Sequence, residues 1–325
     1  MRLKLLFAIL LVLCIYLPTQ AQYNFFTQNL NSGITLNPAK AGVGEHNMRT
    51  TVILNSYSYG ASDILQPCIF ASLDAKLFKH KKKLQISGGC LFNKQGFFKR
   101  YGMMHIWKAG LCIGLSKKFG KRHQQFISFG STFSLNSMEL AYTWQFTQLE
   151  RYCDFDLGVL YGLRLSKRTE IVISAALQHQ RPKYLLQLPP FSDNIFVPIN
   201  TRNAQLQVNY KPNKRILAQA SIVLHAPSVF NKATSQRIAE CSAIFDFSVG
   251  KQNNITPKTI VQLGLYARRQ RHISPYFGFR AGTQEFGFSY DLDIAPFYQP
   301  WLSVLPISNL ELSYNCLLSK KNKMK

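Results

Sequence analysis

After the apolar run at residues 5–17, the sequence has no other long apolar run. Beyond residue 21, no stretch of the 325-residue chain is apolar enough for a membrane-spanning helix, which needs about 20 predominantly apolar residues. Acidic residues are also scarce: 15 Asp and Glu stand against 39 Lys and Arg, and the formal net charge is +24. The first absence excludes a helical membrane protein, but a closed β-barrel still satisfies every backbone group within a bilayer.

Patterns that support catalysis or metal binding are absent too. The seven histidines show neither HExxH nor His-x-His spacing. The sequence also lacks a GxSxG nucleophile elbow and a phosphate-binding glycine loop. Asp291 and Asp293 offer only two carboxylates, far from the roughly six to eight oxygens of a Ca²⁺ site. The sequence therefore predicts no enzyme, with no catalytic residues, no cofactor and no metal.

Closely spaced cysteines are missing as well. No CxxC pair occurs, and six cysteines follow residue 21. They are Cys68, Cys90, Cys112, Cys153, Cys241 and Cys316. Because nearly all of them fall in strand-like runs, we expect small apolar wall residues and neither disulfides nor metal ligands.

Residues 1–21 are typical of a cleaved secretory signal peptide. Arg2 and Lys4 precede an apolar core at 5–17, Pro18 breaks the helix, and 19–21 supply small residues for cleavage. The apolar core is shorter than a membrane span. We therefore expect export.

The stretch 153–180 indicates how the exported chain is built. In run 153–166, apolar residues from Phe155 to Leu165 alternate with Asp, Gly, Arg and Ser, and run 169–180 alternates in the same way. Side chains of a strand point to opposite faces with period two, so each run has one oily face. Runs of this length match tilted membrane strands of about 9–11 residues. On the polar face, Asp154 and Asp156 are expected to pair with Arg164 or Lys108.

Fourteen such runs predict an all-β fold, a transmembrane antiparallel β-barrel of about 14 strands over 49–318. The runs are 49–57, 66–78, 83–92, 107–117, 124–135, 153–166, 169–180, 203–211, 214–225, 237–250, 258–269, 272–281, 283–291 and 308–318. Mostly long links (58–65, 93–106, 136–152, 181–202, 226–236 and 292–307) alternate with mainly short ones. Segment 138–146 is strand-like and is expected to extend the fifth strand above the membrane. Since short turns face the periplasm, both termini are expected there, in the outer membrane of a Gram-negative bacterium.

Residues 22–48 do not alternate like a membrane strand. Asn37-Pro38 begins a turn, and Gly42 supplies backbone freedom. We expect an N-terminal periplasmic or lumenal segment that lies in the barrel mouth or plugs the lumen.

The same segment carries a specific pattern, Q-x-x-x-F-x-Q followed by N-P-A-x-A-G. Its residues are Gln22, Phe26, Gln28, Asn37, Pro38, Ala39, Ala41 and Gly42. The pattern resembles the mature start of the PorP/SprF family of type IX secretion system outer-membrane proteins of Bacteroidota. Segments 93–96, 154–178 and 286–291 are similar to later parts of that family, so the resemblance extends over essentially the whole chain.

The resemblance implies a barrel that works with the type IX apparatus. Such a protein assists secretion or cell-surface attachment of sorting-domain proteins, including adhesins of gliding motility. Its implied partners are outer-membrane lipid, periplasmic type IX components and the secreted cargo. Two other functions stay open: a passive outer-membrane porin, which a Gly/Ser/Gln/Arg lumen suits, and a lipid enzyme, which the missing Ser/His arrangement disfavours.

Basic residues crowd the short turns and the tail at 319–325. This basic rim holds 19 of the 39 Lys and Arg residues and no acid. Its members are Lys79, Lys81, Lys82, Lys83, Lys117, Lys118, Lys121, Arg122, Lys167, Arg168, Lys211, Lys214, Arg215, Lys251, Lys258, Lys320, Lys321, Lys323 and Lys325. The rim either meets lipid head groups or docks an acidic periplasmic partner. A nucleic-acid partner is disfavoured because the basic residues lie in turns of an exported chain.

Overall fold

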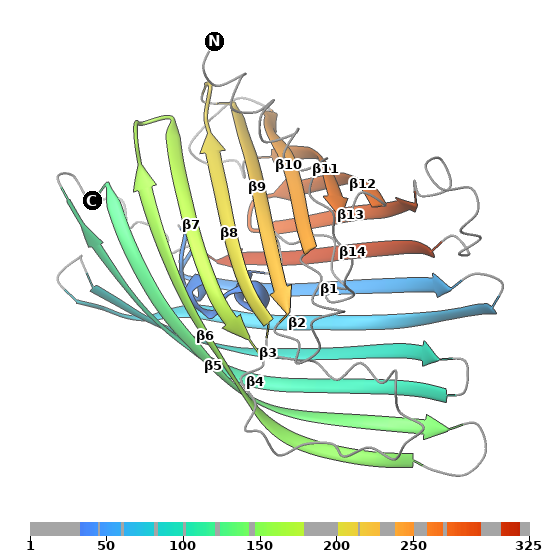
Figure 1. Ribbon diagram of the computed structural model, residues 1–325. Coiled ribbons are helices and arrows are strands. Elements are labelled where there is room, and N and C mark those ends of the chain that lie inside the picture. The colour runs from blue at the N-terminus through green and yellow to red at the C-terminus, as the bar shows by residue number, and fades with distance from the viewer. Residues whose placement is uncertain are drawn as a thin grey trace.

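The computed structural model describes thirteen stretches of the chain. They are 33–44, 46–59, 62–80, 84–99, 102–120, 124–142, 147–178, 201–213, 215–227, 238–249, 259–268, 272–293 and 307–318. Fourteen antiparallel strands form one closed barrel, in which each strand pairs with its neighbours in sequence and the last pairs with the first (Figure 1). The predicted strand number and fold class are confirmed.

The strands differ in length between the two parts of the wall. Their bounds are β1 (Met48–Tyr59), β2 (Ser62–His80), β3 (Leu84–Lys99), β4 (Gly102–Phe119), β5 (Gln125–Tyr142), β6 (Thr147–Arg164), β7 (Thr169–Gln178), β8 (Thr201–Tyr210), β9 (Ile216–Pro227), β10 (Ile238–Val249), β11 (Thr259–Arg268), β12 (His272–Ala281), β13 (Gln284–Asp293) and β14 (Ile307–Leu318). Strands β2 to β6 have 16–19 residues, whereas the others have 10–12. The closing seam runs in unbroken register from Met48–Leu318 to Tyr59–Ile307.

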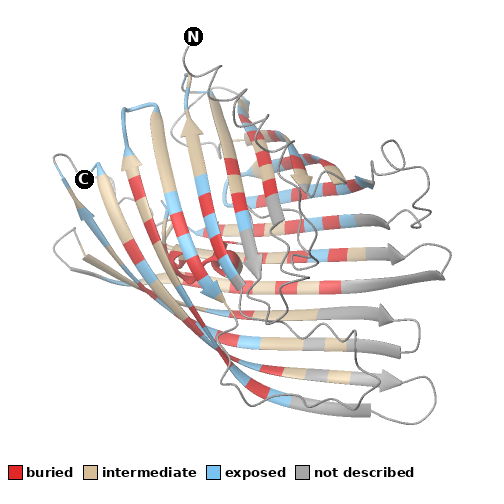
Figure 2. Ribbon diagram, viewed as in Figure 1, coloured by how far each residue is buried: buried red, intermediate tan, exposed pale blue. Residues whose placement is uncertain are grey.

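Alternation along each strand separates lipid from lumen (Figure 2). In β6, Asp154 and Asp156 are 1% and 4% exposed, whereas Phe155 and Leu157 are 40% and 42% exposed. The burial pattern therefore agrees with the alternation predicted from the sequence, in which apolar side chains point outward and polar or small side chains point inward.

Three of the predicted long links are wrong. Residues in 58–65, 93–106 and 136–152 largely continue the strands, since β3 runs to Lys99, β4 starts at Gly102 and β5 ends at Tyr142. The expected extension of the fifth strand is confirmed as far as Tyr142, and residues 143–146 lie outside the described residues. The apolar face of a strand ends at the edge of the membrane, but its backbone continues to pair with the neighbouring strands in water. The hydrophobic pattern therefore predicted these strands to be shorter than they are. Most of the other long links, in 181–202, 226–236 and 292–307, lie outside the described residues.

Two short helical turns lie inside the barrel: α2 (Gly33–Leu36) and η1 (Pro38–Lys40) (Figure 1). Within the described stretches, no helix is long and apolar enough to cross a membrane. We call residues 33–44 the lumen segment.

Candidate functional site: an occupied lumen

A row of small residues crosses the inner wall beneath the lumen segment. The backbone register places them side by side on five neighbouring strands, β3 to β7. The small-residue row consists of Ser87, Gly114, Gly130, Gly158 and Ala176. Small side chains at adjacent positions leave room for another backbone to approach the wall.

The lumen segment follows this row from strand to strand. At Gly158 on β6, an added Cβ would lie 1.9 Å from Asn37 Oδ1. At Gly130 on β5, an added Cβ would lie 2.3 Å from the Pro38 carbonyl carbon. Any larger side chain at these two positions would displace the Asn-Pro turn, because real Cβ atoms do not approach other atoms so closely.

Asn37 fixes the start of the turn. Its Oδ1 accepts a hydrogen bond from the Ala39 amide at 2.8 Å, and Asn37 thereby caps η1. Its Nδ2 donates to the carbonyl oxygens of Val159 at 3.1 Å and Ala175 at 3.0 Å. Asn37 is 2% exposed. An amide meets these demands because it carries both an acceptor and two donors on one short side chain.

Hydroxyl groups of the wall hold the next carbonyls. Ser128 Oγ donates to the Ala39 carbonyl and Ser87 Oγ to the Ala41 carbonyl, each at 2.7 Å. Gln178 Nε2 also donates to the Thr35 carbonyl. Wall side chains therefore bind backbone atoms of the lumen segment, so that a buried turn has few unpaired carbonyl groups.

Gly42 ends the turn beside a buried carboxylate. Its amide donates to Asp74 Oδ2 at 2.8 Å, and Gln85 Nε2 donates to its carbonyl oxygen at 2.8 Å. Its φ of 63° lies in the left-handed region that favours glycine. Asp74 also forms an ion pair with Arg49 of β1, at 2.9 Å between Nε and Oδ1. This carboxylate thus joins the lumen segment to the first two strands.

An apolar cluster closes the inner side of the segment. Ile34 packs with inward side chains of the first four strands, each at most 6% exposed. The cluster is Ile34, Ala41, Ile53, Phe70, Leu91 and Cys112. Burial of Ile34 favours the seated position by roughly 1.5–3 kcal/mol, the usual range for a buried aliphatic side chain.

Lys40 is the cation that the lumen segment brings inside the barrel. Desolvation by burial, followed by repulsion from the Arg49 charge, lowers the pKa of Lys40 to about 7. Because the pKa of Lys40 is lowered, protonation of its amine opposes seating, which is the binding of the lumen segment to the inner wall.

A second ionic cluster lies on the wall formed by β4 to β6. Lys108 Nζ is 2.8 Å from Asp156 Oδ2 and 3.5 Å from Asp154 Oδ2. The ion pairs reach across β5 and connect β4 to β6, two of the long strands. The expected pairing with Lys108 is confirmed, whereas Arg164 lies 3.8 Å from Glu170.

Acidic side chains gather inside the barrel, a feature that the sequence predicted only for Asp154 and Asp156. Eight of the 15 Asp and Glu residues are buried on inward positions. They are Asp74, Asp154, Asp156, Glu240, Asp246, Glu285, Asp291 and Glu311. Several accept hydrogen bonds from lumen amides, such as Asn55 to Glu311 at 3.1 Å. The sequence contained a sign of this arrangement, because each of these acids occupies a position on the polar face of its alternating run.

The other predicted site residues are distributed differently. Lys117 and Lys118 lie exposed at the end of β4. Lys81, Lys82, Lys83, Lys121, Arg122, Lys320, Lys321 and Lys323 lie outside the described residues, as do Gln22, Phe26 and Gln28. The structure brings Asn37, Pro38, Ala39 and Gly42 together on the small-residue row. In the stretches that the structure describes, no group of three His, Cys, Asp or Glu residues is placed to hold a metal.

Several solved structures with a similar fold are transport channels. The toluene transporter TbuX of Ralstonia pickettii superposes with a TM-score of 0.56 over 89% of this chain and 94% of its own, at 6% identity. The CymD monoaromatic hydrocarbon channel gives a TM-score of 0.53 over 92% and 95%, at 8% identity. The Pseudomonas putida toluene transporter TodX gives 0.50 over 92% and 95%, at 9% identity. No protein-family model matches the chain, and no curated protein matches its sequence. The fold is that of Gram-negative outer-membrane β-barrels.

Proposed function

We propose that this chain is a plugged outer-membrane barrel of the type IX secretion system, which assists secretion or surface attachment of sorting-domain proteins such as adhesins. The observation that carries the proposal is the seating of Asn37–Gly42 on the small-residue row. All of these residues but Lys40 belong to the pattern that resembles the PorP/SprF family, and wall groups form hydrogen bonds with Asn37, Ala39, Ala41 and Gly42.

The two channel alternatives fit the lumen less well. A passive porin needs an open aqueous path, whereas here the lumen segment lies across the inner wall of β2 to β7. A channel for toluene-like compounds, as in the structural neighbours, needs an apolar lining. Buried carboxylates such as Glu285 and Glu311 disfavour such cargo because apolar ligands leave them without solvent.

Deletion of the gene in its native host tests the secretion role. We expect sorting-domain proteins to disappear from the cell surface and to accumulate in the periplasm, as measured by surface proteolysis and mass spectrometry of cell fractions. Complementation with the wild-type gene restores display. Normal display in the deletion strain, together with steady conductance of the purified wild-type barrel in planar bilayers, would support the porin instead.

The basic rim supplies a second test, because we propose that it docks an acidic periplasmic partner. Lys117 and Lys118 are exposed at the short-turn end of β4. Their joint replacement by Glu is expected to leave heat-modifiable gel migration intact and to reduce cargo display. The matched control replaces Leu111 and Ile113, which face outward on the same strand, by Val. If the charge-reversed strain displays its cargo normally, the basic rim contacts lipid head groups and does not dock a protein partner.

A further inference from the structure

One strand of the wall extends far beyond its neighbour. β6 has 18 residues and β7 has 10. β6 pairs with β5 from Thr147 to Leu163, but with β7 only from Leu157 to Arg164 (Figure 1). Within the described stretches, no strand lies on the other side of residues 147–156. We call that side the β6 edge, and at the rise of a strand it spans about 33 Å.

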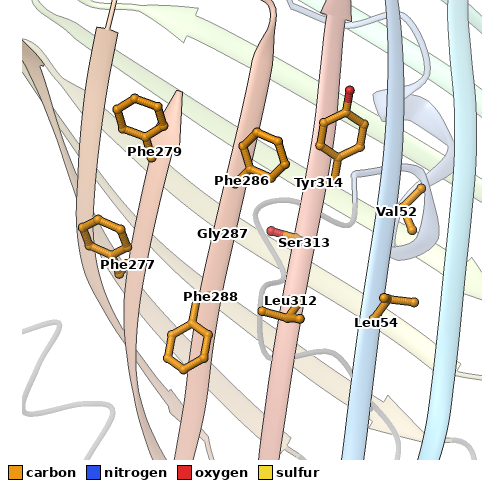
Figure 3. Close-up of a pocket in the computed structure, with 10 residues that line it drawn as sticks. All are labelled: Val52, Leu54, Phe277, Phe279, Phe286, Gly287, Phe288, Leu312, Ser313 and Tyr314. Carbon is orange, nitrogen blue, oxygen red and sulfur yellow. The ribbon is translucent and has the colours of Figure 1, made fainter. Parts of the chain in front are cut away.

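The seam where the barrel closes shows how a continuous wall differs from this edge. There β14 pairs with β13 on one side and with β1 on the other. Apolar side chains such as Phe286 and Leu312 line a groove over this continuous sheet (Figure 3). Only side chains are presented at the seam, whereas the β6 edge presents backbone groups as well.

The backbone groups at the β6 edge follow from the pairing with β5. Alternate residues of a paired strand direct their amides and carbonyls to opposite edges. The Arg164 amide donates to the Gln124 carbonyl at 2.8 Å, on the β5 side, and the register between β5 and β6 is unbroken. The amides and carbonyls of Arg151, Cys153 and Phe155 therefore face the β6 edge.

Asp154 shows how the fold satisfies one of these amides. Its Oδ1 accepts a hydrogen bond from the Phe155 amide at 2.9 Å. A neighbouring side chain thus occupies the place that the carbonyl of another strand takes elsewhere in the wall, and charged residues commonly protect exposed strand edges. A strand added to the edge would replace this cap with its own carbonyl, while Asp154 keeps its ion pair with Lys108 at 3.5 Å.

The side chains along the β6 edge select the residues of an added strand. Cys153 and Phe155 face outward and are exposed, whereas Asp154 and Asp156 face the lumen and are 1% and 4% exposed. Side chains that lie opposite each other on paired strands point to the same face of the sheet. Apolar residues of an added strand would therefore lie beside Cys153 and Phe155, and Lys or Arg residues would lie beside the two carboxylates.

We propose that the β6 edge binds an extended segment of a partner protein as an added antiparallel strand, with apolar residues facing outward and Lys or Arg facing the lumen. A second copy of the chain fits less well, because it would bring its own Asp154 and Asp156 to the same face, where like charges repel. The chain's own wall passes from β7 to β8 through the pair Gln178–Thr201, and neither strand continues along the β6 edge. This inference does not depend on the secretion role.

Two methylated peptides of identical composition test the backbone pairing. Each is a short fluorescent peptide of alternating Val and Lys, with N-methyl groups either on every Val or on every Lys. In antiparallel addition, residues opposite Arg151, Cys153 and Phe155 carry the hydrogen bonds, and the proposal places Val there. We therefore expect the purified barrel in neutral detergent to bind the N-methyl-Lys peptide at least about tenfold more tightly than the N-methyl-Val peptide, as measured by fluorescence anisotropy. Glu in place of Lys is expected to weaken binding by a similar factor, because it would face Asp154 and Asp156.

A photo-crosslink locates the bound peptide. With benzoylphenylalanine in place of one Val, we expect mass spectrometry to find adducts within residues 147–156. Cys153→Pro removes an edge amide and leaves the β5 ladder intact, so it should weaken binding at least about tenfold, whereas the matched control Cys153→Val keeps the amide and binds like wild type. If the proline variant loses heat-modifiable migration, the adducts and the two methylated peptides decide the question on the wild-type barrel.

Several results would overturn the proposal. Equal binding of the two methylated peptides, or tighter binding of the N-methyl-Val peptide, would exclude the proposed backbone pairing. Adducts outside residues 147–156 would place the peptide elsewhere, and a lack of adducts would mean that the β6 edge takes no added strand. A wild-type dimer that Cys153→Pro dissociates would make a second copy of the chain the occupant.

Discussion

Asn37→Ala is the sharpest perturbation of the lumen segment. The substitution removes two hydrogen bonds to wall carbonyls and one within the turn, at 2.8–3.1 Å. At about 0.5–1.5 kcal/mol for each bond, the seated state loses about 3 kcal/mol. That loss corresponds to about a 150-fold shift toward the released segment.

Limited trypsin digestion measures this shift. Trypsin cleaves after Lys40 only when the segment leaves the small-residue row, so the cleavage rate follows the released fraction while reseating is faster than cleavage. We expect the Asn37→Ala barrel in detergent to be cut there up to about 150 times faster than wild type. Mass spectrometry of the N-terminal fragment identifies the cleavage site.

A second lumen asparagine provides the control. Asn209 donates to Glu170 at 3.2 Å and accepts from Gln207 at 2.9 Å, and none of these bonds involves the lumen segment. Asn209→Ala is expected to leave cleavage after Lys40 unchanged. Equal cleavage rates for Asn37→Ala and wild type would refute the idea that this side chain holds the segment.

Three further outcomes follow from the same contacts. Gly130→Val places a branched side chain where the Pro38 carbonyl carbon lies 2.3 Å from the Cβ position, so cleavage after Lys40 should exceed that of an Ala109→Val control, which is exposed on the outer face of β4. The pKa of Lys40, lowered from 10.5 to about 7, means that the released segment binds more protons between these pH values, so binding of the segment to the wall strengthens from pH 7 toward pH 10. Lys40→Arg, which stays charged over this range and keeps the tryptic site, removes this dependence in the same digestion. Leu263, 48% exposed in the middle of β11, faces lipid, so Leu263→Arg should lower the free energy of unfolding in urea by about 2–4 kcal/mol and Leu263→Ala by less.

Period-two alternation was enough to predict the barrel, because a membrane strand must separate lipid from lumen at every second residue. Phe155 and Asp156 show that separation in both sequence and structure. The strand extensions toward Lys99 and Tyr142 were underestimated because they need no oily face.

The binding site of the lumen segment could be predicted only in part. Asn37-Pro38 indicated a turn, but its partners, the carbonyls of Val159 and Ala175, are more than 120 residues away in sequence. Gly114, Gly130 and Gly158 become neighbours only through the strand register. A one-residue slip in that register would turn a glycine away from the lumen, so the site depends on pairing that sequence periodicity alone does not set.

The short connection from Gly42 to β1 limits what release of the segment can do. Five residues separate Gly42 from the first strand residue, Met48, and they span at most about 20 Å when extended. A released Asn-Pro turn therefore stays tethered beside its own binding row, at a high effective concentration. Release and rebinding of the turn form an intramolecular equilibrium that does not depend on protein concentration. A partner that binds the released turn therefore shifts this equilibrium directly.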